Sequence, residues 1–120
     1  MSMKTINDEE TLDINNLSSD VKLNVTVGNA GLSGTSVKWK DDPNNELADD
    51  PTNVERLSLG KGSFCTGKTL IIETTIKTTI TKKGITTNDF SNATPAQIVE
   101  RGEVDDLGDL LRFHLEVNFK

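Results

Sequence analysis

A chain of 120 residues is long enough for one hydrophobic core and too short for two. Its formal net charge of −6 disfavours nucleic acid or an anionic membrane as the main partner, because such binding needs a concentrated basic face. With one Trp, four Phe and no Tyr, the composition also argues against an aromatic recognition surface.

Residues 1–19 are polar and acidic, and their few apolar residues are too sparse to anchor a helix. We therefore expect a loosely ordered N-terminal arm, with a short edge strand near 11–14, followed by a single folded domain over 20–120. The start of the chain lacks the apolar run of a signal peptide. A cytoplasmic protein is the expectation, and a secreted form whose leader had been removed stays open.

From Asp20 onward, apolar and polar residues alternate as in a half-buried strand. The same alternation predicts four further strands, over 35–40, 54–59, 69–81 and 109–119. The last of these is the most apolar and is expected to lie centrally in a sheet.

Two connections also follow from the sequence. Lys82-Lys83-Gly84 suits a tight hairpin that begins a return strand at Ile85, because glycine accepts the positive φ of a bulged turn. The acidic segment 41–53, which contains Pro43 and Pro51, is expected to be a long surface loop.

One short helix is predicted near 95–101. Thr94 is a good N-cap, Pro95 suits the first helical position, and Gln97 completes a capping box. Gly102 would end the helix after at most two turns.

Strands with one polar face need a second sheet to cover their apolar faces. We therefore predict an all-β fold, an antiparallel β-sandwich of immunoglobulin-like outline with about six to eight strands. A parallel sheet is disfavoured, because its strands would be apolar on both faces. A small β-barrel is the alternative.

Residues Gly62 to Thr69 match the phosphate-loop pattern G-x-x-x-x-G-K-[ST]. A working phosphate loop needs a helix directly after it, whose N-terminal amides face the phosphates. The segment that follows alternates through Leu70, Ile72 and Ile76 with the period of a strand. We interpret the match as a turn, and a small nucleotide-binding or hydrolytic enzyme using Lys68 stays the alternative.

The candidate metal ligands are Asp41, Asp42, Asp49 and Asp50, which could bind calcium through carboxylate oxygens. Their spacing is not that of an EF-hand, and the alternative is a solvated acidic loop that favours solubility.

Cys65 is the only cysteine, which excludes an intrachain disulfide, and His114 is the only histidine. His114 is expected on the polar surface of the last strand, and nothing in the sequence brings Cys65 to it.

The predicted function is a non-catalytic β-sandwich module with a binding, structural or accessory role and no cofactor. It would contact another protein through its loops or an edge strand, with homodimerisation possible. The alternatives are a calcium-dependent ligand-binding module and the small enzyme named above.

Overall fold

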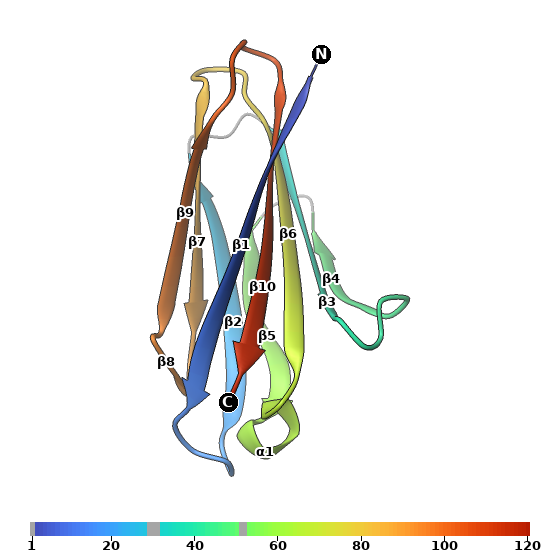
Figure 1. Cartoon of the computed structure of the whole chain (residues 1–120), viewed down its shortest axis with the longest axis vertical. Coiled ribbons are helices and arrows are strands. Elements are labelled where there is room, and N and C mark those ends of the chain that lie inside the picture. The colour runs from blue at the N-terminus through green and yellow to red at the C-terminus, as the bar shows by residue number, and fades with distance from the viewer. Residues whose placement is uncertain (1, 29–31, 51–52) are drawn as a thin grey trace.

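The computed structural model describes residues 2–28, 32–50 and 53–120, without the side chain of Asp50. Two β-sheets pack face to face in an elongated body of 46 × 27 × 21 Å (Figure 1). The six-stranded sheet has the order β4 (Glu46–Asp50), β3 (Leu32–Trp39), β6 (Thr69–Lys77), β10 (Leu110–Phe119), β1 (Met3–Ile14) and β8 (Ala93–Thr94). The four-stranded sheet has the order β5 (Val54–Lys61), β2 (Asp20–Gly28), β7 (Lys83–Phe90) and β9 (Gln97–Glu103).

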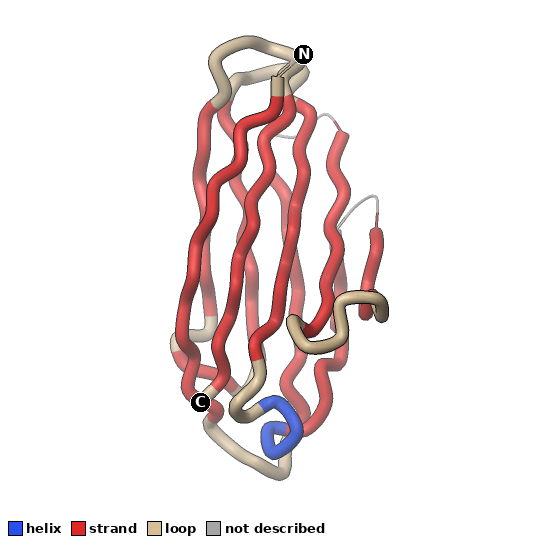
Figure 2. The backbone as a smooth tube through the Cα atoms, turned by 45° about the vertical axis from the view of Figure 1, so that its right-hand side comes forward, coloured by secondary structure: helices blue, strands red, loops and turns tan. Residues whose placement is uncertain are grey.

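The predicted sandwich is confirmed, and the two sheets do not close into a barrel. The described residues form ten strands, more than the expected six to eight. As expected, β10 lies inside its sheet, between β6 and β1. A one-turn helix, α1 (Gly62–Cys65), lies at the end of the body where β10 finishes (Figure 2). Gly67 just after it donates its backbone N–H to Phe119 O over 2.8 Å.

In place of the loosely ordered arm expected for residues 1–19, the chain forms the twelve-residue strand β1. This strand pairs with β10 in parallel, from Met3 opposite Leu110 to Leu12 opposite Phe119. The fold is therefore not all antiparallel. Two of the inward positions of β1 carry carboxylates, Asp8 and Glu10, and these break the apolar alternation by which sequence analysis detects a strand.

The predicted helix near 95–101 is wrong, because β9 occupies this segment and pairs antiparallel with β7. Its inward residues Ile98 and Glu100 are buried, while their neighbours are exposed. A helix of two turns is marginal by itself, so a few capping signals do not outweigh a ladder along the whole of β7.

Two predicted connections are also wrong. Strand β6 ends at Lys77, and β7 begins at Lys83 in the other sheet, so residues 78–82 cross between sheets and form no hairpin. Thr78 anchors this crossing by donating its hydroxyl to Asp109 O over 2.9 Å. The expected surface loop 41–53 contains β4, which adds to β3 because Leu47 and Ala48 pack partly against the core.

The inward-facing residues form two apolar clusters. The larger cluster contains a chain of edge-to-face aromatic contacts that joins the sheets, Trp39 to Phe119 at 6.1 Å and Phe119 to Phe90 at 5.9 Å between ring centroids. The smaller cluster consists of Ile76, Val104, Leu111 and Phe113, with Ile6 and Val27 packed against it.

Between the two clusters lies a layer of inward-facing polar residues. On β6, for example, Thr74 stands between Ile72 of the larger cluster and Ile76 of the smaller one. We call the full set the polar layer; its members are Asp8, Glu10, Thr35, Thr74, Thr86, Asn88 and Glu100. The six-stranded sheet contributes two threonines to the polar layer, and their hydroxyls, Thr35 Oγ1 and Thr74 Oγ1, form a hydrogen bond of 3.1 Å with each other.

Candidate functional site

The phosphate-loop match is followed by a strand, as predicted, because β6 begins at Thr69. The backbone amides in this segment are used by the protein itself, since Gly67 N donates to Phe119 O and Lys68 N donates to Cys65 O. The ammonium of Lys68 lies 3.6 Å from the centroid of the Phe64 ring. Amides and cation are therefore arranged for internal packing, and a strand stands where a phosphate loop needs a helix after Lys68.

Cys65 and His114 lie on opposite sides of the six-stranded sheet. Cys65 belongs to the larger apolar cluster, where its Sγ is 3.5 Å from Leu59 O. Burial raises the pKa of this thiol to about 11; the charge of Lys68 lowers it, and that of Asp20 raises it. His114 lies on the outer face of β10, half-buried. A thiolate activated by this imidazole is thus ruled out by geometry.

The predicted calcium ligands lie along the β3–β4 hairpin. Asp41 and Asp42 follow β3, Asp49 lies in β4, and the side chain of Asp50 is outside the described residues. Within residues 2–28, 32–50 and 53–120, no three acidic, histidine or cysteine side chains come close enough together to hold a metal ion. The calcium site stays a prediction, and a melting temperature unchanged by millimolar calcium and by a chelator would end it.

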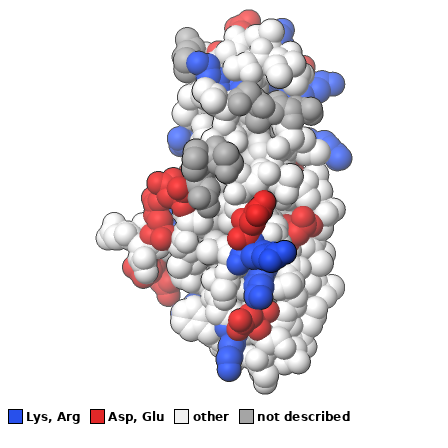
Figure 3. Space-filling view, turned by 180° about the vertical axis from the view of Figure 1, so that it is seen from behind, with Lys and Arg blue, Asp and Glu red and all other residues white. Residues whose placement is uncertain are grey.

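The side of the four-stranded sheet carries charges of both signs (Figure 3). Acidic side chains gather at the flank of the molecule where the β3–β4 hairpin lies, and basic and acidic groups alternate near the centre of this side. Alternation of this kind gives no single-sign field over the surface drawn.

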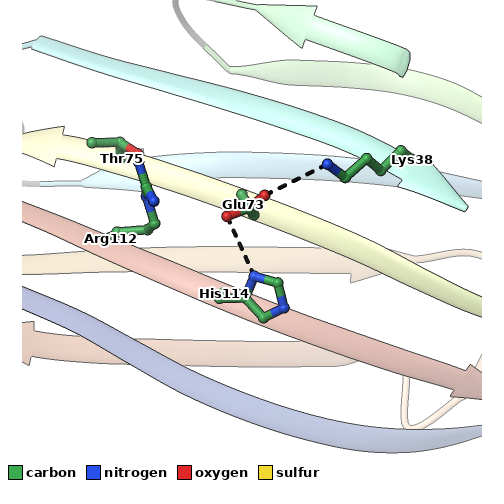
Figure 4. Close-up of polar contacts among 5 residues, drawn as sticks. All are labelled: Lys38, Glu73, Thr75, Arg112 and His114. Atoms are coloured by element: carbon green, nitrogen blue, oxygen red, sulfur yellow. Dashed lines mark hydrogen bonds and ion pairs between the residues drawn. The ribbon is translucent and has the colours of Figure 1, made fainter. Parts of the chain in front are cut away.

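The outer face of the six-stranded sheet brings charged side chains into direct contact (Figure 4). Strand register places Glu73 of β6 directly between Ser36 of β3 and His114 of β10. His114 Nδ1 lies 3.3 Å from Glu73 Oε2, and Lys38 Nζ lies 3.9 Å from Glu73 Oε1. Nearby, Arg112 Nε donates to Thr75 Oγ1 over 3.4 Å. We call these residues the outer polar face; its six members are Ser36, Lys38, Glu73, Thr75, Arg112 and His114.

A shallow hollow of about 390 Å³ opens beside these contacts, between the outer polar face and the acidic residues of β4. It is lined by Gly34, Thr35, Ser36, Glu46, Asp49, Glu73, Thr75 and Arg112. Glu73 contacts both Lys38 and His114, Arg112 donates to Thr75, and no described hydroxyl or thiol forms a hydrogen bond with His114. The hollow therefore offers polar contacts for a ligand.

Sequence analysis placed His114 correctly on a polar strand face but missed its contact with Glu73. The alternation within 69–81 put both residues on outward positions, yet no signal in the sequence fixed which strands are neighbours. Register between strands that are distant in the sequence joined Glu73 to His114, which are 41 positions apart.

The free side of β1 is the second surface with unused binding capacity. Leu110 N donates to Ser2 O over 2.8 Å and Lys120 N donates to Leu12 O over 2.9 Å, so even-numbered residues of β1 direct their backbone groups to the C-terminal strand. Backbone groups alternate in direction along a strand, so the odd-numbered residues from Met3 to Thr11 point away from β10. On that side, β8 pairs with Asp13 and Ile14 and with no other described residue of β1.

No family model, curated protein or solved structure matches this chain. In the described part of the chain, no helix is long and apolar enough to cross a membrane.

Proposed function

We propose that this protein is a non-catalytic binding module of immunoglobulin-like outline that recruits an extended segment of another protein along the free side of β1. The observation that carries the proposal is the row of backbone N–H and C=O groups at Met3, Thr5, Asn7, Glu9 and Thr11, which face away from β10. A strand edge of this kind is a template for an added strand, and main-chain hydrogen bonds supply the affinity.

The short strand β8 supports this mode of binding. Thr94 and Ala93 pair antiparallel with Asp13 and Ile14, so two residues of the chain itself already occupy one end of the same edge. An incoming strand in line with β8 would extend this ladder toward Met3. A second copy of the chain is one such partner, because two β1 edges can pair antiparallel with each other.

One feature of the edge opposes indiscriminate pairing. Asp8 Oδ1 accepts a hydrogen bond from Glu9 N over 2.9 Å, and Asp8 and Glu10 point inward as charged residues. Inward-pointing charges on an edge strand disfavour aggregation between edges. A partner strand must therefore displace the Asp8 carboxylate from this amide, which favours a specific partner over random strands.

The test compares Asn7→Pro with Asn7→Ala. Proline removes the outward N–H of residue 7 and is tolerated on an edge strand, while alanine removes the side chain alone. Both variants are first checked for folding by circular dichroism. We expect partners recovered from native extract, and any dimer seen by sedimentation, to be retained by the alanine variant and lost by the proline variant. Equal retention by a folded proline variant would refute the proposal.

A further inference from the structure

Three buried oxygen atoms of the polar layer have no hydrogen-bond partner among the described residues: Thr86 Oγ1, Asn88 Oδ1 and Glu100 Oε2. Glu100 is 5% exposed, and Thr86 and Asn88 are each 1% exposed. Thr86 lies directly opposite Glu100 across the β7–β9 ladder, and Asn88 is the next inward residue along β7. Three neighbouring oxygen atoms are therefore shut away from bulk water on one inner face.

The hydrogen-bonding capacity of this group depends on the proton of Glu100. Asn88 already donates from Nδ2 to Ile98 O over 3.2 Å, so its Oδ1 is left as an acceptor. An ionised carboxylate only accepts, so with Glu100 ionised the unpartnered oxygen atoms of Asn88 and Glu100 are both acceptors, and the Thr86 hydroxyl can donate to one of them at a time. A protonated Glu100 has an O–H that can be donated to such an acceptor. The Thr86 hydroxyl can supply one hydrogen to these oxygen atoms, and a proton on Glu100 therefore adds a second donor to this part of the layer.

The elements packed around Glu100 bring no positive charge to it. Strand β1 contributes the carboxylates of Asp8 and Glu10, while its Lys4 donates from Nζ to Glu103 O over 2.9 Å, further along the β1–β9 boundary. Strand β7 contributes the uncharged Thr86 and Asn88, and the inward residues of β10 are apolar. None of the ion pairs among the described residues involves Asp8, Glu10 or Glu100.

Burial raises the pKa of Glu100 to about 7, and the negative charges of Asp8 and Glu10 add to the increase. Hydrogen-bonding groups of Asn88 and Thr86 act in the opposite direction, with a smaller effect than burial. Burial and the nearby negative charges thus favour the neutral form of Glu100, which is also the form favoured when the donors and acceptors around it are counted.

We propose that Glu100 makes the β1–β9 side of the sandwich a proton-dependent clasp, closed while Glu100 is protonated and loosened when Glu100 ionises. The two strands are in contact at this boundary, because a Cβ on Gly102 of β9 would collide with Ile6 Cδ1 of β1. An ionised Glu100 would repel the two carboxylates of β1 across that contact. This inference concerns the isolated chain and does not depend on strand recruitment by β1.

The sign of the pH effect follows from linkage. Folding moves the pKa of Glu100 from an ordinary 4.5 to about 7, so the folded chain binds more protons than the unfolded chain between these pH values. The contribution of Glu100 to the free energy of unfolding is fully present below pH 4.5 and is lost as the pH rises through 7. The equilibrium constant for folding should fall about 300-fold over that window and level off above it.

The experiment measures urea unfolding from pH 4.5 to 8.5 for the wild type, Glu100→Gln and Glu103→Gln. Glutamine is uncharged and keeps an N–H donor, so Glu100→Gln should lose the decline and exceed the wild type in stability at pH 8. Glu103 lies exposed on the same strand, and its substitution should leave the wild-type decline intact. Carboxyl-carbon NMR of the wild type reports the Glu100 titration directly and does not depend on the folding of a variant.

Hydrogen exchange of the wild type tests the loosening itself. After correction for intrinsic rates, protection of β1 amides should fall between pH 6 and pH 8 relative to β2. A Glu100 titration below pH 5, parallel pH profiles for the wild type and Glu100→Gln, or β1 protection that stays constant would each overturn the proposal.

Discussion

The hydrogen bond between Thr35 and Thr74 gives a quantitative test of the polar layer in the six-stranded sheet. The two hydroxyl oxygens are 3.1 Å apart, and the residues are 1% and 2% exposed. Thr35→Val or Thr74→Val removes one hydroxyl with little change of shape. Each single substitution breaks a bond that contributes about 1 kcal/mol and leaves a buried hydroxyl whose desolvation costs about 1–3 kcal/mol.

The added methyl group offsets part of this cost, by about 0.8 kcal/mol when fully buried. We therefore expect each single variant to lose about 1–2 kcal/mol of unfolding free energy. In the double variant neither position 35 nor position 74 carries a hydroxyl, and two apolar groups meet between the clusters. Its stability should lie within about 1 kcal/mol of the wild type, which makes the coupling energy about 1–3 kcal/mol.

Urea denaturation of the four proteins at one pH measures this cycle, with the slope m checked for constancy. Thr75→Val is the matched control, because Thr75 lies on the outer face of the same strand and its substitution should cost less than about 0.5 kcal/mol. Additive losses in the double variant would refute the reasoning, because they would mean that each hydroxyl finds a partner of its own when the other is removed.

Three further outcomes are expected. Phe119→Ala, which removes a 2% exposed ring in edge-to-face contact with two others, should cost about 3–5 kcal/mol in urea denaturation, and a loss below about 1 kcal/mol would contradict its place between the sheets. Gly62→Ala should lower the melting temperature more than Gly67→Ala, since a Cβ at Gly62 would collide with the Asn16 backbone oxygen. A Cβ at Gly67 would meet open space, so that substitution costs only the conformational strain of a φ of +85°. Equal melting temperatures of the two variants would argue against this packing of α1. Cys65, with its pKa raised to about 11 by burial, should resist a thiol reagent at pH 8 until the chain unfolds, and rapid labelling of the native protein would show that the thiol is accessible.

Several strands could be predicted because their inward residues are apolar without interruption. Strands β2 and β10 are cases of this kind, and the alternation of β10 also gave the outward orientation of His114. The strand after Lys68 followed from the same period and was enough to set the phosphate-loop match aside. These predictions depend on local alternation, which a side-chain period of two makes visible in the sequence.

The prediction failed where inward positions are polar or where the partner strand is distant. Asp8 and Glu10 hid β1, and Glu100 left Ile98 without the apolar neighbours that would have marked β9 as a strand. The capping signals at Thr94 and Gln97 then suggested a helix. The three carboxylates are not anomalous in their own segments, because Glu100 becomes buried, and Asp8 and Glu10 partly buried, only when the two sheets close over them.

The sequence by itself determined that the chain forms β-strands with alternating residues, and that each strand has one apolar side to bury. Tertiary structure alone decided the parallel pairing of the N-terminal strand with the C-terminal one, the contact of Glu73 with His114, and the alignment of seven polar residues from five strands into one internal layer. The physical reason is that alternation specifies which side of a strand faces inward, whereas neighbours and register are set by the combined packing of all strands. A carboxylate such as Glu100 therefore acquires its unusual environment only in the closed sandwich.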